Sequence, residues 1–394
     1  FTGNMDTYKP AEGSATRSDI AITDPDFKYP SLWKSNIAAD YKFGDGWVAT
    51  VELLYSKDIN AIYHDNIGLY RTEQFVNDGG AGNARPYYNG YYSDREGNQK
   101  AANHVVMLRN TSKGHSLYTT FQLQKNFVDG ILKGLYLNGS YSFGQSRGVT
   151  DGTSSVATSA WKYRAALDGN AEEVGYTAGS FDGRLLLSAS YTANWSKYAA
   201  TSFGLIYQRY RPFRYSYCYN GDANGDSQFS NDLMYIPANF DEVKDHLLPG
   251  DFDSQEDAWK AMNASIEQDP YLSKHRGEYA ERNGAVAPFA NQLDLSVSHD
   301  IKIYQKNGRS HTLRFSFNIA NFLNLLNRNW GVVQTTVLGN QQYQFLTIPK
   351  GQGPSAANNY TLKYTMAKDL DETFKDNLND VSRWQMQFGI KYIF

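Results

Sequence analysis

The final stretch of the chain, residues 382–394, alternates between large apolar side chains and mostly polar ones. Successive side chains of a strand point to opposite faces, so one face here carries only large apolar groups. These are Trp384, Met386, Phe388, Ile390, Tyr392 and Phe394. A transmembrane strand has this pattern because one face meets lipid and the other meets water, whereas an edge strand of a soluble sandwich seldom keeps it so long. We interpret Phe388, Tyr392 and Phe394 as a membrane-insertion signal.

The same alternation recurs upstream and predicts about nine long strands joined alternately by short turns and very long loops. The predicted strands are residues 32–43, 47–55, 115–127, 133–144, 183–195, 199–213, 291–303, 311–322 and 382–394. Short turns are predicted at Gly44-Asp45-Gly46 and at Asn307-Gly308, where glycine accepts the backbone angles of a tight hairpin. Strands of a soluble sandwich average about 5–6 residues, so this pattern is typical of a membrane barrel.

Composition supports a strand-based membrane protein over a helical one. The mean hydropathy is -0.58 and no apolar run reaches the ~18 residues that a spanning helix needs. Aromatic residues make up 15% of the chain, and several flank the predicted short turns, as in an interfacial girdle. The formal net charge of -3 gives no basic field for nucleic acid. The fold expected is therefore all-β, an antiparallel transmembrane β-barrel with long extracellular loops.

The direction of the strands predicts that this barrel needs further strands. Short turns mark the periplasmic side, so residues 1–31 are expected to start on the extracellular side and the last strand to end at the opposite rim. An odd strand count does not match bacterial single-chain barrels, whose strand number is even. We expect that an N-terminal part is missing from this sequence.

Three motifs resemble the C-terminal barrel of TonB-dependent outer-membrane receptors. They are residues 215–237 (YSYCYNGDANGDSQFSNDLMYIP), 271–288 (YLSKHRGEYAERNGAVAP) and 318–331 (NIANFLNLLNRNWG). The Oar-like receptors of the carboxypeptidase-regulatory-domain type are the nearest group, and SusC-like transporters are more distant. The resemblance implies that residues 1–394 supply roughly the last nine strands of an about 22-stranded barrel, with a long extracellular insertion at residues 214–288.

The resemblance also implies a function, a location and partners. The family imports an extracellular ligand across the outer membrane of Gram-negative bacteria with energy from TonB-ExbB-ExbD, which acts through an N-terminal plug. That plug is absent from this sequence. The expected partners are outer-membrane lipid, the N-terminal part of the same receptor and a surface lipoprotein. No cofactor is required.

Residues 222–226 (DANGD) place oxygen-bearing side chains at alternate positions, as calcium loops do. The candidate ligands are Asp222, Asn224, Asp226 and Asp232. Ser227 stands where the calcium loop of an EF-hand has glycine, and Asp232 comes one place before the expected bidentate carboxylate. A polar Asx-turn in an outer loop is the alternative.

Aromatic residues of the predicted loops form a second candidate site. Tyr87, Tyr88, Trp161, Tyr215 and Tyr217 are placed to grip a glycan or a peptide by stacking. The alternative is that they pack against one another above the barrel.

The sequence contains no motif of a hydrolase, a nucleotide-binding loop or a zinc site, so we expect no enzyme. Two other functions stay open at this point. An outer-membrane barrel enzyme, such as a protease or a lipase, needs acid, base or nucleophile groups converging at one rim. A secreted, calcium-binding carbohydrate module needs a soluble sandwich.

Overall fold

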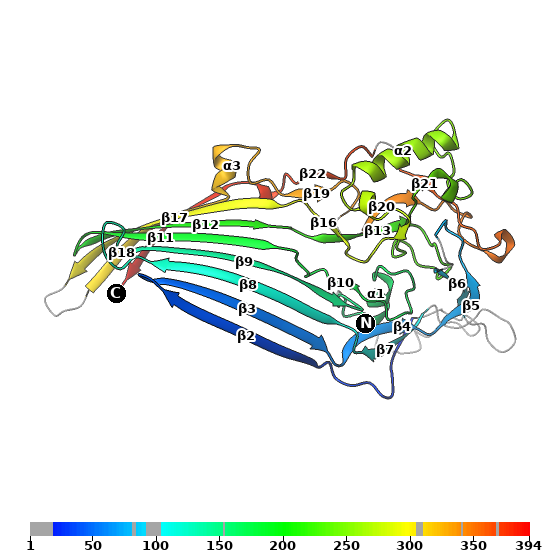
Figure 1. Ribbon diagram of the computed structural model, residues 1–394, viewed down its shortest axis with the longest axis horizontal. Coiled ribbons are helices and arrows are strands. Elements are labelled where there is room, and N and C mark those ends of the chain that lie inside the picture. The colour runs from blue at the N-terminus through cyan, green and yellow to red at the C-terminus, as the bar shows by residue number, and fades with distance from the viewer. Residues whose placement is uncertain are drawn as a thin grey trace, which may run out of the picture.

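Nine long strands pair side by side in chain order to form one large antiparallel sheet (Figure 1). The computed structural model describes residues 19–80, 84–91, 104–152, 154–304, 310–339, 342–367 and 370–394. The nine strands are β2 (Leu32–Phe43), β3 (Trp47–Asp58), β8 (His115–Asn126), β9 (Leu135–Gly148), β11 (Arg184–Ser196), β12 (Ala199–Tyr210), β17 (Ala290–Tyr304), β18 (Ser310–Ala320) and β23 (Gln385–Ile393). The expectation of an all-β chain built on these nine strands is confirmed.

The register of the sheet brings the apolar side chains of neighbouring strands together on one face. Val51 of β3 lies opposite Phe121 of β8, which lies opposite Tyr141 of β9. Further along, Leu205 of β12 lies opposite Leu295 of β17. Because register places alternate residues of all nine strands on the same side, these side chains form one continuous surface, which we call the apolar face.

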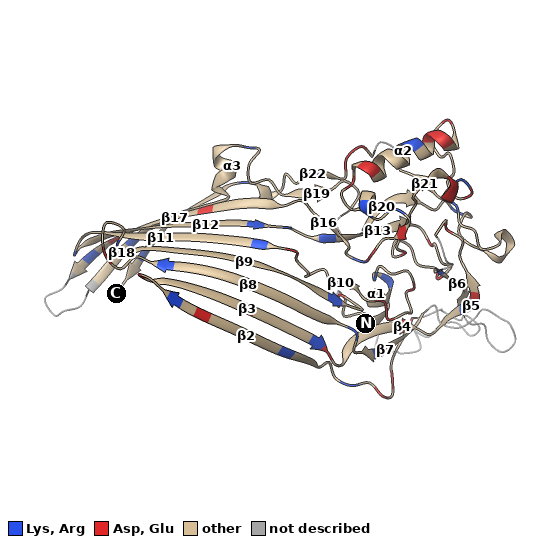
Figure 2. Cartoon of the chain, in the orientation of Figure 1, with Lys and Arg blue, Asp and Glu red and all other residues tan. Residues whose placement is uncertain are grey.

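The apolar face is exposed rather than packed against other parts of the chain. Ile37 of β2 is 70% exposed, and Phe388 and Ile390 of β23 are 64% and 62% exposed. Few charged residues lie in the middle of the strands (Figure 2). Lys125, on the apolar face, lies beside a turn, where its ammonium contacts the rings of Trp47 and Phe127 at 5.4 and 5.0 Å.

The opposite face of the sheet is polar. Side chains there bond across strands, as in the 2.8 Å contact between the hydroxyls of Thr120 and Ser142. Arg314 binds Asp300 through two hydrogen bonds of 2.6 and 2.8 Å. We call this side the polar face.

The short connections lie together at the left-hand end of the sheet in Figure 1, where the chain also ends. Residues 44–46 join β2 to β3, and Gly44 and Gly46 take φ values of 50° and 79°. A Cβ on Gly46 would lie 2.6 Å from the carbonyl oxygen of Asn126, so this turn requires glycine. The turn predicted at Asn307-Gly308 lies outside the described residues.

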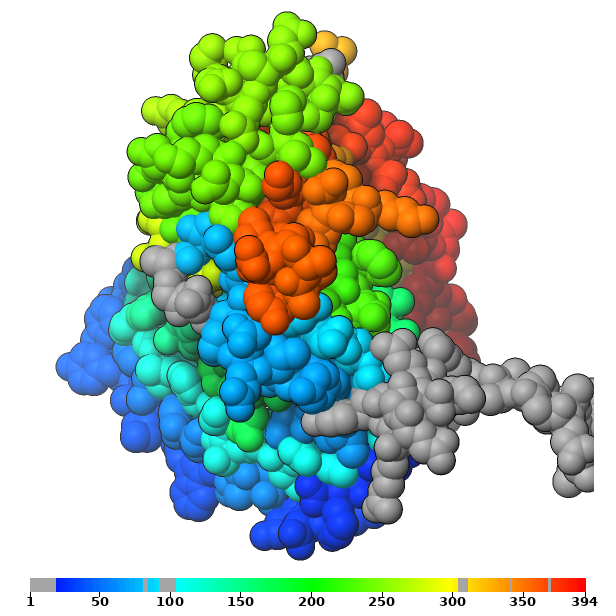
Figure 3. Space-filling model, turned by 90° about the vertical axis from the view of Figure 1, so that its right-hand side faces the viewer, coloured from blue at the N-terminus to red at the C-terminus, as the bar shows by residue number. Residues whose placement is uncertain are grey.

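The long connections gather at the other end of the sheet into a packed body, which we call the loop domain (Figures 1 and 3). It comprises residues 59–114, 149–183, 211–289 and 334–376, apart from the undescribed positions. Its strands are β1 (Ile20–Thr23, from the segment before β2), β4 (Ala61–Asn66), β5 (Leu69–Phe75), β6 (Pro86–Tyr91), β7 (Val105–Thr111), β10 (Gly175–Tyr176), β13 (Arg214–Asn220), β14 (Tyr235–Ile236), β15 (Glu278–Tyr279), β16 (Ala285–Val286), β19 (Gln334–Thr336), β20 (Gln342–Thr347), β21 (Thr365–Met366) and β22 (Phe374–Asp376). Its helices are α1 (Ala157–Lys162) and α2 (Gln255–Gln268), with 3-10 turns η2 (Phe240–Glu242), η3 (Leu272–Lys274) and η4 (Ala356–Asn358). The short helix α3 (Phe322–Leu326) lies apart from them, beside β17 of the large sheet (Figure 1). Asn321, which precedes α3, donates to the carbonyl oxygen of Ser382 at the end of the 3-10 turn η5 (Asp380–Ser382).

The main hydrophobic core lies in the loop domain and not in the large sheet. Helix α2 begins at its N-cap Ser254, whose Oγ accepts a hydrogen bond from the backbone N–H of Asp257 at 3.1 Å. Ala258, Met262 and Ile266 recur every four residues and face this core. The core also receives β13 and β20, which pair in parallel. None of the helices among the described residues is both long and apolar enough to cross a bilayer.

Candidate functional site

The five aromatic residues predicted to grip a ligand are all buried inside the loop domain. Their exposures are 6% for Tyr87 and 1% for each of Tyr88, Trp161, Tyr215 and Tyr217. Tyr87, Tyr215 and Tyr217 belong to the main core, whereas Tyr88 and Trp161 form a smaller cluster with Leu69 and Val106. In this arrangement their rings pack against protein and present no open stacking surface.

The polar atoms of these aromatic side chains have partners inside the loop domain. The Tyr88 hydroxyl donates to Oδ1 of Asp168 at 2.6 Å. The Tyr217 hydroxyl donates to Oδ2 of Asp269 at 2.5 Å. The same carboxylate accepts the hydroxyl of Thr373 at 2.7 Å and the backbone N–H of Leu272 at 2.8 Å. Asp269 therefore joins β13, η3 and the segment before β22.

The predicted calcium ligand Asp222 closes a tight turn. Its Oδ1 accepts the backbone N–H groups of Asn224 and Gly225 at 3.2 and 2.6 Å, and its Oδ2 accepts that of Ser227 at 2.8 Å. A carboxylate that accepts the N–H two residues ahead is the defining contact of an Asx-turn. The Asx-turn, which was the alternative to a calcium site, therefore accounts for the observed hydrogen bonds of Asp222.

The other two carboxylates of this segment are fully buried. Asp226 accepts the backbone N–H of Gln228 at 2.8 Å and the side-chain amide of Asn224 at 3.2 Å. Asp232 accepts the backbone N–H of Ala223 at 2.8 Å. Within the described ranges, no group of three or more His, Cys, Asp or Glu side chains is arranged to hold a metal ion.

Burial dominates the ionisation of these carboxyls. It raises the pKa of Asp226 well above the ordinary value, with the charge of Asp232 adding to the effect. Burial also raises the pKa of Asp232, to about 7, although the guanidinium of Arg85 opposes the rise. Arg85 donates to Asp232 at 3.3 Å and to Asp78 at 2.9 Å, so one buried cation holds two loops together.

The three residues interpreted as an insertion signal lie on β23 or just beyond it. Phe388, Tyr392 and Phe394 are 64%, 56% and 91% exposed. Phe388 lies opposite Phe317 and Tyr392 opposite Leu313, so the register continues the apolar face to this strand.

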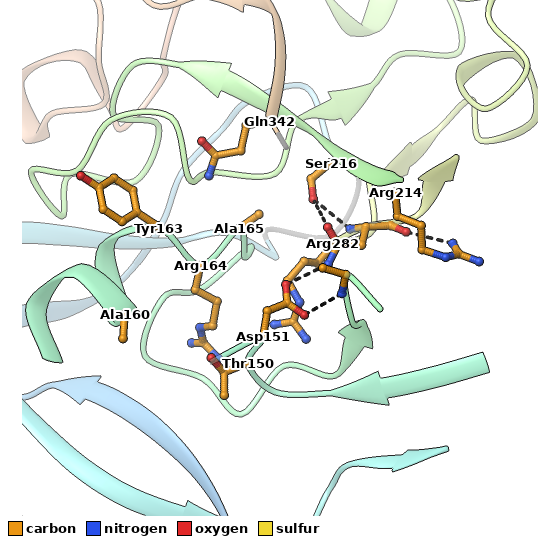
Figure 4. Close-up of a pocket in the computed structure, with 12 residues that line it drawn as sticks. Thr150, Asp151, Ala160, Tyr163, Arg164, Ala165, Arg214, Ser216, Arg282 and Gln342 are labelled. Carbon is orange, nitrogen blue, oxygen red and sulfur yellow. Dashed lines mark hydrogen bonds between the residues drawn. The ribbon is translucent and has the colours of Figure 1, made fainter. Parts of the chain in front are cut away.

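A cavity of about 60 Å³ lies in the loop domain between the segment after β9, α1 and the residues before β16 (Figure 4). Its lining includes Arg164, Arg282, Arg214, Asp151 and Asn283. Arg164 and Arg282 are 6% and 3% exposed.

Backbone carbonyls hold both of these guanidinium groups. Arg164 donates to the carbonyl oxygens of Val149 at 3.1 Å and Ala171 at 2.9 Å, and also to that of Gly169. Arg282 donates to the same Val149 oxygen and to that of Gly148. Burial, together with the positive charge of Arg282, lowers the pKa of Arg164 to about 10, although the charges of Glu173 and Asp168 oppose this change. Burial likewise lowers the pKa of Arg282.

Sequence reasoning did not identify this cavity. Arg164 and Arg282 are single arginines in loops of ordinary composition. The carbonyl acceptors of Arg282 at Val149 and Gly148 lie more than a hundred positions away, whereas those of Arg164 lie within 15 positions. An arginine among small and aromatic residues, as in residues 160–165 (AWKYRA), is a weak signal that a cation is buried.

Comparisons with protein-family models, with curated proteins and with solved structures find no match for this chain.

Proposed function

We propose that this chain forms part of a transmembrane β-barrel in the outer membrane of a Gram-negative bacterium, and that the barrel belongs to an active-transport receptor. The receptor binds an extracellular ligand and imports it with energy derived from TonB. The proposal rests mainly on the exposed apolar face.

The apolar face supports a lipid contact. Water-soluble proteins seldom expose apolar patches of more than a few hundred Å², and larger ones mark interaction with a membrane or a partner. Here apolar side chains line up across nine paired strands while the polar face carries cross-strand hydrogen bonds. A strand of about 12 residues rises roughly 40 Å, enough when tilted to cross the ~25 Å apolar band of an outer membrane.

The edges of the sheet support completion by further strands. Among the described residues, β2 pairs only with β3, and β23 pairs only with β18. A long edge strand leaves a row of unpaired N–H and C=O groups, which cannot be left unsatisfied in lipid. We propose that strands of the N-terminal part of the same receptor pair with these edges and close an about 22-stranded barrel.

The connections are short at one end of the sheet and long at the other, and this difference supports one orientation of the barrel in the membrane. In outer-membrane barrels short turns face the periplasm and long loops face outward. The loop domain would then meet the ligand first, the polar face would line the lumen, and TonB would act through a plug on the periplasmic side.

Membrane insertion is tested by cell fractionation and by fluorescence quenching with lipids brominated in their acyl chains. We expect the protein in the outer-membrane fraction, with quenching of Trp33 and Trp195, which are 61% and 68% exposed on the large sheet. Trp161, buried in the loop domain, is the internal control and stays unquenched. A protein that stays in the supernatant without detergent would instead support the secreted module.

Transport is tested by measuring which compounds the cells remove from the growth medium. Cells with and without the receptor, each with and without TonB, are compared by mass spectrometry of the medium. A compound depleted only when both are present supports import, and the absence of any such compound contradicts it. Hydrolysis of casein or phospholipid by the purified protein would favour a barrel enzyme.

A further inference from the structure

Two arginines contact one phenylalanine ring where the large sheet meets the loop domain. The guanidinium carbon of Arg209 lies 4.4 Å from the ring centre of Phe289, and that of Arg211 lies 4.1 Å from the same centre. Arg209 is the second-last residue of β12, Arg211 follows that strand, and Phe289 directly precedes β17. We call these three residues the arginine–phenylalanine cluster.

The register of the sheet places Arg209 on the apolar face. It lies opposite Leu185 of β11 and Asn291 of β17, and it follows Leu205 and Tyr207 at alternate positions of β12. Leu205 lies at the middle of β12, and four residues of a strand rise about 13 Å, roughly half of the ~25 Å apolar band of an outer membrane. If the apolar face meets lipid, Arg209 therefore lies at the edge of the hydrocarbon, at the level of the lipid headgroups.

The positive charge around this cluster is shared by a single carboxylate. Arg209 is exposed, and among the described residues it forms no hydrogen bond and no ion pair. Asp182 lies 3.5 Å from Nε of Arg211, and the same carboxylate also binds Arg214. Burial and the nearby charge of Arg209 lower the pKa of Arg211 despite this carboxylate. Arg209 is thus a cation on the apolar face without an anionic partner in the described part of the chain.

We propose that the arginine–phenylalanine cluster binds the phosphate of a lipid headgroup in the outer leaflet of the membrane. A charged side chain at the edge of hydrocarbon is stabilised by an anion at the same depth, and basic sites beside membrane-spanning segments bind anionic headgroups in this way. Arginine suits phosphate because its planar donors match the phosphate oxygens. The ring of Phe289, which is 36% exposed, holds both guanidinium groups at one place. This inference rests on the proposed function, since the cluster meets a headgroup only if the sheet lies in a membrane.

The competing explanation is that both arginines only pack on the Phe289 ring and extend into solvent. The two explanations differ in selectivity for phosphate. Native mass spectrometry of the full chain, released from nonionic detergent micelles, measures which lipids stay bound. Dioleoyl phosphatidic acid is the probe, dioleoylglycerol is the same lipid without phosphate, and inorganic phosphate is the headgroup alone.

We expect phosphatidic acid to bind at least tenfold more tightly than dioleoylglycerol, and Arg209→Gln to weaken that binding at least fivefold. A second variant, Asn291→Glu, keeps both arginines and places a carboxylate opposite Arg209 on β17. This carboxylate competes with the phosphate for the guanidinium, so binding should fall by a similar factor. Asn291→Gln is the uncharged control for that variant and should bind like the parent.

The matched control for Arg209 is Arg184→Gln. Arg184 is also exposed, begins the neighbouring strand β11 at the same end of the sheet, and lies 6.0 Å from the ring centre of Tyr210. It differs in the face that it occupies, since it bonds Gln208 at 3.1 Å on the polar face. Its loss should therefore leave the binding of phosphatidic acid unchanged.

The proposal is overturned if dioleoylglycerol binds as tightly as phosphatidic acid, or if inorganic phosphate binds as tightly as the lipid, which would indicate a site for free phosphate. It is also overturned if Arg209→Gln and Asn291→Glu both bind like the parent. Should one of these variants fail to fold, the other decides. Cell fractionation separates this result from the proposed function. A chain that lies in the outer membrane but does not select phosphatidic acid loses only this site, whereas a chain in the supernatant loses the proposed function and the lipid site with it.

Discussion

Arg85 and Asp78 form an ion pair of 2.9 Å in which neither side chain is exposed to solvent. The same guanidinium reaches Asp232 at 3.3 Å and lies 5.5 Å from the ring centres of Tyr219 and Tyr279. One arginine thus joins the segment after β5 to the segment that contains the Asp222 turn.

Replacing Arg85 with Met should destabilise the loop domain by about 3–5 kcal/mol, because two buried carboxylates lose their cation. Urea unfolding in micelles, followed by the fluorescence of the buried Trp161, measures the change. The control is Arg71→Met, which removes an ion pair with Asp168 at 2.9 Å in which Arg71 is half exposed. That loss should cost about 1 kcal/mol or less. Equal losses in the two variants would show that Arg85 is not central.

The buried carboxyl of Asp232 should make the loop domain less stable as pH rises from about 4 to about 7. Its folded pKa of about 7 lies above the ordinary value of about 3.9, so the folded state binds the proton more tightly over that interval. The stability that this proton contributes is fully present below the ordinary pKa and is lost as pH rises through the folded pKa. Unfolding free energies across this range should fall less steeply in Asp232→Asn, and an unchanged slope would assign the effect to other groups.

Calcium should leave the melting temperature of the loop domain unchanged, because backbone N–H groups already occupy the oxygens of Asp222. Thermal melting with and without calcium, in the parent and in Asp226→Ala, makes the comparison. A calcium-dependent rise in the parent that disappears in Asp226→Ala would instead establish the calcium site predicted from the sequence.

Leu295→Arg should weaken insertion into a bilayer by about 2–4 kcal/mol, because Leu295 lies on the apolar face opposite Leu205 and Ile319. Ser296→Arg is the matched control, since the next residue of the same strand points to the polar face. We expect that control to insert like the parent. Refolding into vesicles over a range of urea concentrations measures both variants. Equal costs would contradict the distinction between the two faces, and a cost in Ser296→Arg alone would mean that they are assigned the wrong way round.

Tyr217→Phe should destabilise the loop domain by about 1–3 kcal/mol, because buried Asp269 loses one of its hydroxyl donors. Tyr163→Phe, at a 68% exposed position, should change stability by less than about 0.5 kcal/mol. Urea unfolding measures both. If Tyr217→Phe unfolds like the parent, the Asp269 contact contributes little to stability.

The long strands could be predicted because their pattern is local. Strand β2 begins and ends where the alternation of its residues begins and ends, and the glycine turn after it was visible in three residues. Strand β9 extends past the predicted end at Gly144 to Gly148, since Arg147 still pairs with His115 of β8 and with Tyr176 of β10. The residues of β9 after Gly144 are polar or glycine on both faces, so no alternation marks them in the sequence. Only their pairing with neighbouring strands shows that they belong to β9.

The short strands of the loop domain could not be predicted in the same way. In β13 every residue from Arg214 to Tyr219 is buried. Both faces of this strand therefore pack against protein, and no alternation of exposure marks it. The strand that pairs with β13 is also remote from it in the sequence, as the parallel pairing of Tyr217 with Tyr343 shows. For the same reason the aromatic residues chosen as ligand contacts could not be separated by sequence from core residues.

The nine strands, the glycine turn at residues 44–46 and the apolar face can be read from the sequence alone, because successive side chains of a strand point to opposite faces. Only the tertiary structure decided which loop residues meet. Arg85 and Asp232 lie 147 positions apart, and Arg282 and Val149 lie 133 apart. Contacts of this kind depend on how several connections fold over one end of the sheet, and they leave no periodic trace along the chain.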